Sequence, residues 1–306
     1  MLRCIMEAMD VLDHPDASGQ RVKDWLSQFE SSEITVSRIE EQTGGTDFVR
    51  VVIPAAHKTG PTLGIIGRLG GIGARPAALG LVSDADGCIV ALACAAKLAE
   101  MALRGDVLDG DVILTTHVCP NAPTVHHEPT PFMGSPVDMV VMNRMEVDHA
   151  MSAILSVDAT KGNWILNQRG FAITPTVKEG YILRIDERLL EIMTCVTGRT
   201  PVVLPITTQD ITPYGNGLYH LNSIMQPATA TSAPVVGVAM IAAAAVAGCA
   251  TGANQAVDLE MAARFCVEVA KSYTAGIWPM YDKDEFDMLT EMYGSMNHLS
   301  ESKPKC

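Results

Sequence analysis

The fold is decided by three consecutive segments: TLGIIGRL (62–69), SDADGCIVALACAAKLAEMALRG (83–105) and GDVILTTHV (110–118). The first and third are short apolar runs typical of buried strands, and the middle one repeats its apolar residues with a helical period. A strand, a helix and a second strand in this order predict a βαβ unit within a largely parallel sheet. Ligands of such sheets bind outside the carboxyl ends of the strands.

The flanking segments extend this pattern without a clear domain boundary. Further strands are predicted for EITVSRI (33–39), DFVRVVIP (47–54), AILSVDA (153–159) and PVVGVAMI (234–241), and a closing helix for QAVDLEMAARFCVEVAKSY (255–273). Helices that alternate with buried strands are typical of layered α/β proteins. We therefore expect residues 1–306 to form a single domain, a three-layer α/β/α sandwich with a mixed, mostly parallel sheet.

Composition narrows the possible partners. A net charge of -13 argues against nucleic acid, because phosphate binding needs a basic surface. The longest apolar run, residues 234–248, is shorter than the ~20 residues of a membrane span. Eight cysteines without a CxxC pair are typical of a reducing cytoplasm. Charged residues make up only 19% of the chain, which favours a homo-oligomer, although a well-packed monomeric domain would explain this equally well.

Candidate site residues follow the predicted strands. Asp84 and Asp86 open the predicted helix, where a carboxylate also suits the positive end of the helix dipole. His117 and Cys119 end one strand, and Asp158 ends another. Because the carboxyl ends of parallel strands share one edge, we expect these groups to converge on a metal ion or a charged substrate.

Other candidates lie in predicted turns and loops. Arg68 opens the glycine-rich stretch GRLGGIGARP (67–76), which is expected to form a tight turn close to a ligand or a neighbouring strand. A long polar stretch, residues 206–233, has the character of a binding loop or lid. The remaining candidates in turns and loops are Lys161, Lys178, Glu179, Asp210 and His220.

Several strings are specific enough to indicate a family. They are GRLGGIGARP (67–76), TTHVCPNAPT (115–124), DATKGN (158–163), TPTVKEGYIL (174–183) and TTQDITPYGNGLYHLNSIMQP (207–227). In these strings the chain resembles the bacterial and archaeal family called domain of unknown function 1177, over nearly its whole length. That resemblance implies no established activity.

A second, more distant resemblance is to the co-catalytic zinc aminopeptidases and carboxypeptidases. The turn Asp84-Ala85-Asp86-Gly87 is similar to their D-x-x-G turn, and Asp158 is similar to their later strand-end aspartate. The chain departs from them at three places. Arg68-Leu69-Gly70 replaces their H-x-D, Thr116-His117 replaces their acidic pair, and the region of Cys249 lacks their late histidine.

From these residues we expect a hydrolase of an amide or peptide-like small molecule. In this hypothesis one divalent metal, zinc or manganese, is held by Asp84, His117 and Asp158, with His127 or Cys119 as a fourth ligand. Asp86 or Glu179 is the expected general base. A substrate carboxylate is expected at Arg68, Lys161 or Lys178, and further substrate contacts at Asp210 and His220. The alternatives are a metal-free binding or scaffold protein, and a thiol enzyme that uses Cys119 with His117 or His127.

Overall fold

A computed structural model describes residues 1–42, 44–68, 81–122, 124–126, 132–160, 166–206, 223–244 and 255–297. A nine-stranded sheet has the order β1-β2-β4-β3-β7-β11-β9-β10, and β8 also pairs with β11. The central strands β4, β3, β7 and β11 are mutually parallel, and the outer pairings are antiparallel. The predicted mixed sheet is therefore confirmed, with its parallel pairings confined to these four central strands.

The sheet strands have the following bounds: β1 Glu33–Glu41, β2 Gly44–Ile53, β3 Leu63–Gly67, β4 Val112–Val118, β7 Ala153–Ala159, β8 Gly170–Ile173, β9 Val177–Lys178, β10 Tyr181–Ile182 and β11 Val235–Ile241. The short strands β5 Thr124–Val125 and β6 Phe132–Met133 form a separate ribbon. Strands β3, β4 and β11 are buried along their whole length, as expected for strands covered on both faces.

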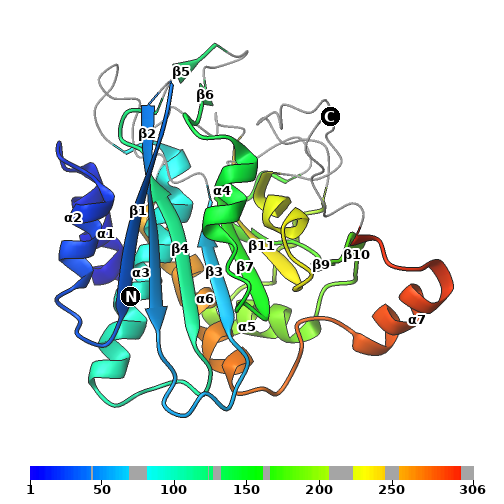
Figure 1. The fold of residues 1–306 in the computed structure, drawn as a ribbon. Coiled ribbons are helices and arrows are strands. Elements are labelled where there is room, and N and C mark those ends of the chain that lie inside the picture. Colours follow the sequence, from blue (N-terminus) through cyan, green and yellow to red (C-terminus); the bar gives the residue numbers. More distant parts are fainter. Residues whose placement is uncertain are drawn as a thin grey trace.

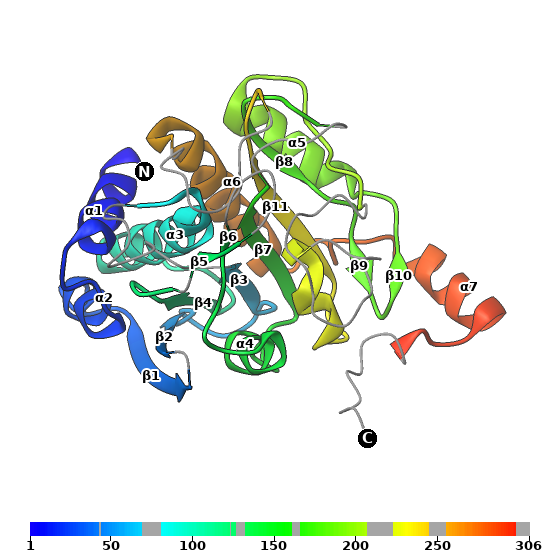
Figure 2. The same cartoon turned by 90° about the horizontal axis from the view of Figure 1, so that it is seen from above.

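Helices cover both faces of the sheet (Figures 1 and 2). The helices are α1 Leu2–Asp13, α2 Gly19–Leu26, α3 Asp86–Leu103, α4 Met139–Glu146, α5 Glu187–Thr197, α6 Ala256–Thr274 and α7 Lys283–Tyr293, with 3-10 turns η1 Ser83–Ala85 and η2 Ser223–Thr229. One face packs against α1, α3, α5 and α6 in the larger core, and η2 packs on the other face. Helix α4 lies on the same side of the sheet as η2 (Figure 2).

Helix α3 begins one turn later than its sequence indicates. Ser83 has the residue type of an N-cap, but it starts the 3-10 turn η1, and α3 begins at Asp86 without a side-chain cap. The next residue, Gly87, packs so closely on the ends of β3 and β7 that an added Cβ would lie 2.4 Å from the Val157 carbonyl oxygen and 2.6 Å from that of Arg68. Glycine is required here because the helix start touches the backbone of two strands.

Residues 171–183, FAITPTVKEGYIL, lie at the margin of the sheet opposite to β1. They fold into β8, β9 and β10, and α7 packs beside the β9–β10 turn, where Tyr181 and Tyr281 contact Phe286 edge-on. In both views α7 stands out from the body of the molecule (Figures 1 and 2). Within the described residues, no helix is both long and apolar enough to cross a membrane.

Candidate functional site

Three adjacent strand ends place polar residues side by side. Gly67, the last residue of β3, is in register with Thr116 of β4 and Val157 of β7. The residues that follow, Arg68, His117 and Asp158, therefore occupy equivalent positions at the carboxyl edge. All three are buried, and ionisable side chains are rarely buried unless they are paired. Arg68 lies at the middle position of the three.

The Arg68 guanidinium is fully buried and bound by helix α4. Nη1 donates to Glu146 Oε2 at 2.7 Å and to Asn143 Oδ1 at 3.1 Å. The side chains of both Arg68 and Glu146 are 0% exposed. Nη2 donates to the Met139 thioether, whereas Nε has no hydrogen-bond partner among the residues that the structure describes. The Nη1 group of the guanidinium is thus well paired, whereas the edge formed by Nε and Nη2 is poorly paired.

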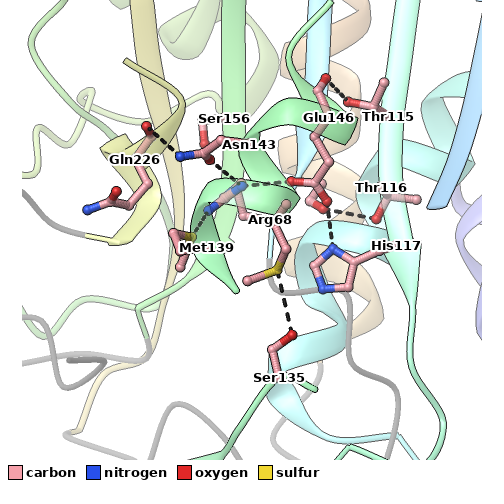
Figure 3. A network of polar contacts seen from close by, with 12 residues as sticks. Arg68, Thr115, Thr116, His117, Ser135, Met139, Asn143, Glu146, Ser156 and Gln226 are labelled. Atoms are coloured by element: carbon pink, nitrogen blue, oxygen red, sulfur yellow. Dashed lines mark hydrogen bonds and ion pairs between the residues drawn. The ribbon is translucent and has the colours of Figure 1, made fainter. Parts of the chain in front are cut away.

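Glu146 joins Arg68 to His117 (Figure 3). Its second carboxylate oxygen, Oε1, lies 2.6 Å from Nδ1 of His117. Burial by itself raises the pKa of Glu146, but the charges of His117 and Arg68 and their hydrogen bonds outweigh it and hold the pKa below its usual value. Glu146 is therefore an ionised carboxylate inside the protein.

The ionised carboxylate decides the tautomer of His117. A carboxylate only accepts hydrogen bonds, so the proton between the two groups belongs to Nδ1. In the neutral imidazole, Nε2 then carries a lone pair and acts as a base or a metal ligand. The ring is further held against Phe48, at a centroid distance of 5.7 Å. His117 thus has a fixed orientation and a defined basic nitrogen.

Neighbouring threonines attach this network to the sheet. Thr115 donates to the backbone carbonyl of Glu146 at 2.8 Å, and Thr116 donates to that of Gly67 at 2.9 Å. The first bond fixes the end of α4 on β4, and the second closes the β3–β4 edge. Position and charge of Glu146 are therefore set by contacts distant in sequence.

The three aspartates are buried but differ in position. Asp84 lies in η1 and Asp86 at the first position of α3, and both take part in interactions within the chain. Asp158 accepts a hydrogen bond from the backbone N–H of Ala159 at 2.7 Å. The contact of Gly87 with Arg68 and Val157 brings this helix start to the same sheet edge. The predicted gathering of the strand ends is therefore present at the level of the backbone.

The described residues do not by themselves fit a metal ion. Among them, no group of three or more His, Cys, Asp or Glu side chains is arranged to hold one, so Asp84, His117 and Asp158 alone do not form the expected centre. Arg68 supplies the buried positive charge beside Glu146, and it stands between His117 and Asp158 in register. The fourth expected ligand, His127, lies outside the described residues.

Two other predicted residues are in a different part of the molecule. Lys178 and Glu179 lie at the β9–β10 turn, where β9 pairs with the first residue of β11, far along the sheet from the end of β4. Lys178 binds Glu179 at 3.0 Å and lies over the rings of Tyr281 and Phe286. The structure therefore does not bring the pair to the edge that holds His117.

Cys119 is buried and lies 3.6 Å from the Gly45 carbonyl oxygen. Burial raises its pKa, which favours the neutral thiol over the nucleophilic thiolate. The geometry thus gives no support to a thiol enzyme at this position.

Other predictions stay open. Lys161, Asp210 and His220 lie outside the described residues, as does most of the expected lid at 206–233. The expected homo-oligomer and small-molecule substrate also stay predictions.

Sequence reasoning missed Glu146 and Asn143, the two residues that organise the site. Both lie on α4, a helix of eight residues that carries no recognisable catalytic motif. A start signal was present, because Asp138 caps the helix by accepting from the Val140 N–H at 2.8 Å. Nothing local, however, pairs Glu146 with Arg68, 78 residues earlier in the chain.

The fold is shared with solved aminopeptidases. The Legionella pneumophila LapA aminopeptidase matches with a TM-score of 0.55 and 10% identity, over 91% of this chain and 72% of that one. The bottromycin maturation enzyme BotP, also solved in complex with Mn, matches at 0.53 and 15% identity, over 90% and 70% of the two chains. The cytosol aminopeptidase of Coxiella burnetii matches at 0.50 and 11%, over 87% and 68%.

The fold and the site together define an α/β protein of aminopeptidase-like architecture with a buried ion-pair network at its carboxyl edge. No curated protein matches the chain. The family model of the protein of unknown function DUF1177 matches residues 37–303, and the chain belongs to this family.

Proposed function

We propose that the protein is a hydrolase of an amide or peptide-like small molecule, with its reaction centre at His117. The observation that carries the proposal is the buried His117–Glu146 pair at the carboxyl edge of an aminopeptidase-like fold. A histidine oriented by an ionised carboxylate is a common device for proton transfer in hydrolysis.

The proposed reaction uses Nε2 of His117 as the base. Nε2 takes a proton from a water molecule whose oxygen attacks the amide carbonyl carbon. The same nitrogen then returns the proton to the amide nitrogen as the C–N bond breaks, which yields an acid and an amine. Glu146 stabilises the imidazolium that exists between the two steps. Arg68 keeps Glu146 ionised throughout.

Binding of zinc or manganese with His117 as one ligand stays a separate proposal, and it needs ligands beyond the described Asp84 and Asp158. A carboxylate that accepts from Nδ1 also occurs behind metal-bound histidines, so the His117–Glu146 pair is compatible with a ligand role. Metal analysis of protein purified without added metal, followed by readdition of zinc or manganese, tests this proposal independently of turnover. One equivalent of bound metal that is lost in the His117→Gln variant would support it.

Activity measurements test the hydrolase. Amine release from a panel of dipeptides, N-acyl amino acids and aminoacyl anilides should be detected for the wild-type protein. His117→Gln should lower the rate by about 10²- to 10⁴-fold, the usual contribution of general acid–base catalysis. His149→Gln, at an exposed histidine, is the matched control and should leave the rate unchanged. Full activity in His117→Gln would refute the proposed centre.

A metal-free binding protein is the second candidate. The observation that favours it is the fully buried Arg68–Glu146 pair. Arg68 stands where the zinc peptidases that the sequence distantly resembles carry the histidine of their H-x-D. This candidate predicts saturable binding of a small molecule without turnover, with and without added metal. Absence of turnover across the panel, together with such binding, would decide for it.

A further inference from the structure

The unpaired edge of Arg68 has a shape that selects one class of ligand. A guanidinium carries five N–H groups, and two of them, on Nε and Nη2, point in parallel along one edge. Nη1 is occupied by Glu146 and Asn143. On the Nε–Nη2 edge, the only acceptor among the described residues is the thioether of Met139. A thioether is a weak acceptor.

We propose that this edge of Arg68 is a subsite for a ligand carboxylate, covered by Met139 when it is empty. A buried N–H without a partner is costly, and a carboxylate would satisfy both donors of the edge with two charge-assisted hydrogen bonds. Arg68 would then bridge two carboxylates, that of Glu146 on one side and that of the ligand on the other.

Met139 has the properties of a displaceable cover. It is the first residue of α4, is half-buried, and lies beside the guanidinium (Figure 3). Its unbranched side chain changes rotamer at low cost. Moving the thioether away removes a weak hydrogen bond and part of the packing of Met139 on the cluster of Phe48, Val137 and Met142, and it exposes the edge that a carboxylate can occupy.

The position of the edge indicates the substrate class, and this step rests on the proposed function. Arg68 and His117 contact opposite oxygens of the same Glu146 carboxylate, so the two groups are one carboxylate apart. In an N-acyl amino acid, only the nitrogen and the α-carbon separate the amide carbonyl carbon from the carboxylate carbon. An N-acyl amino acid, or the end of a peptide, that binds this edge would therefore lie in the same network as His117, with its carboxylate on the side of Arg68 away from Glu146.

Matched acids and amides test the subsite directly. N-acetyl-L-amino acids and their carboxamides differ at one group, and calorimetric titration of the full-length protein measures both. The acids should bind at least about tenfold more tightly than the amides, because the amide cannot form a charge-assisted fork with Arg68. Equal affinity for acid and amide, or no binding of any acid, would overturn the proposal.

Two variants locate the binding. Met139→Ala removes the cover and should tighten acid binding by about threefold or more, because the open state becomes more populated. Met145→Ala, at another half-buried methionine of α4 that packs with the Phe48 cluster, should leave the affinity unchanged. Arg68→Lys keeps the charge but loses the fork, and should weaken acid binding by about tenfold. If Arg68→Lys does not fold, the comparison of Met139→Ala with Met145→Ala still tests the subsite. Unchanged affinity in Met139→Ala contradicts the proposal.

The outcomes for subsite and hydrolase are separable. Selective binding of acids without any amine release would keep the subsite and reject the hydrolase. Amine release from neutral amides at the same rate as from the acids would keep the hydrolase and reject the subsite.

Discussion

Two arginine–carboxylate pairs at the end of helix α4 have the same chemistry in opposite surroundings. Arg68 binds Glu146 at 2.7 Å with both side chains 0% exposed. Arg50 binds Asp148 at 2.6 Å with side chains 38% and 25% exposed. The distances are nearly equal, but removing two charges from water costs several kcal/mol per ion, whereas solvent screens the outer pair. The burial of the inner pair, Arg68–Glu146, is therefore not explained by packing alone.

The largest expected difference between the two pairs is in stability. Glu146→Gln leaves Arg68 buried without a counter-charge and should lower the free energy of unfolding by about 3–5 kcal/mol. Asp148→Asn should lower it by less than about 1 kcal/mol, because Arg50 is already partly solvated. Urea unfolding of both variants measures the difference. Similar losses in the two variants would show that burial does not distinguish the pairs.

A double-mutant cycle sharpens the comparison. Arg68→Met in the Glu146→Gln background removes the uncompensated charge, so the double variant should be more stable than the sum of the single losses predicts, by about 1–3 kcal/mol. The corresponding cycle of Arg50→Met and Asp148→Asn should give a coupling of about 0.2–1 kcal/mol. An inner coupling no larger than the outer one would contradict the account.

Lowering the pH should remove the stability that the carboxylates of Glu146 and Asp148 contribute. Burial raises the pKa of each, but partners outweigh it: His117 and Arg68 for Glu146, and the Ala150 N–H and Arg50 for Asp148. A carboxyl whose pKa is lowered by folding contributes stability above its unfolded pKa, roughly 4.3 for Glu and 3.9 for Asp. That stability is lost as the pH falls through the folded pKa.

The pH dependence of unfolding in the two variants separates these contributions. Between neutral pH and about pH 3, Glu146→Gln should flatten the loss of stability more than Asp148→Asn does. The free energy of unfolding, measured by urea titration at several pH values, gives both slopes. Identical curves for Glu146→Gln and wild-type protein would mean that Glu146 does not titrate with a lowered pKa.

Salt should have the smallest effect. Raising NaCl from about 0.05 to 0.5 M shortens the screening length, which weakens an exposed pair and leaves a buried one almost unchanged. The Arg50–Asp148 coupling should fall by a few tenths of a kcal/mol, and the Arg68–Glu146 coupling should stay constant within error. The double-mutant cycles repeated at the two salt concentrations provide the measurement.

The fold could be predicted from the sequence because its signals are local. Continuous apolar runs such as 63–67 and 112–118 and the helical period after Asp86 indicate buried strands and a covering helix. The order of these elements then restricts the topology. Even the position of His117 at a strand end follows from the length of its apolar run.

The partners of His117 could not be predicted in this way. Glu146 is 29 residues from His117 and 78 from Arg68, and only the packing of α4 on β4 joins them. Lys178 and Glu179 show the opposite error, because their turn resembles a site in the sequence and lies at a distant margin of the sheet. Pairing of charges across the fold depends on the third dimension, which sequence spacing does not encode.

The tautomer of the His117 ring shows directly whether Glu146 fixes His117 with Nε2 as its basic nitrogen. Nitrogen-15 NMR of histidine-labelled protein at neutral pH reports which ring nitrogen carries the proton, and His117→Gln assigns the signal. We predict a proton on Nδ1, a lone pair on Nε2, and loss of this preference in Glu146→Gln. A neutral ring protonated on Nε2 in the wild-type protein would contradict this prediction.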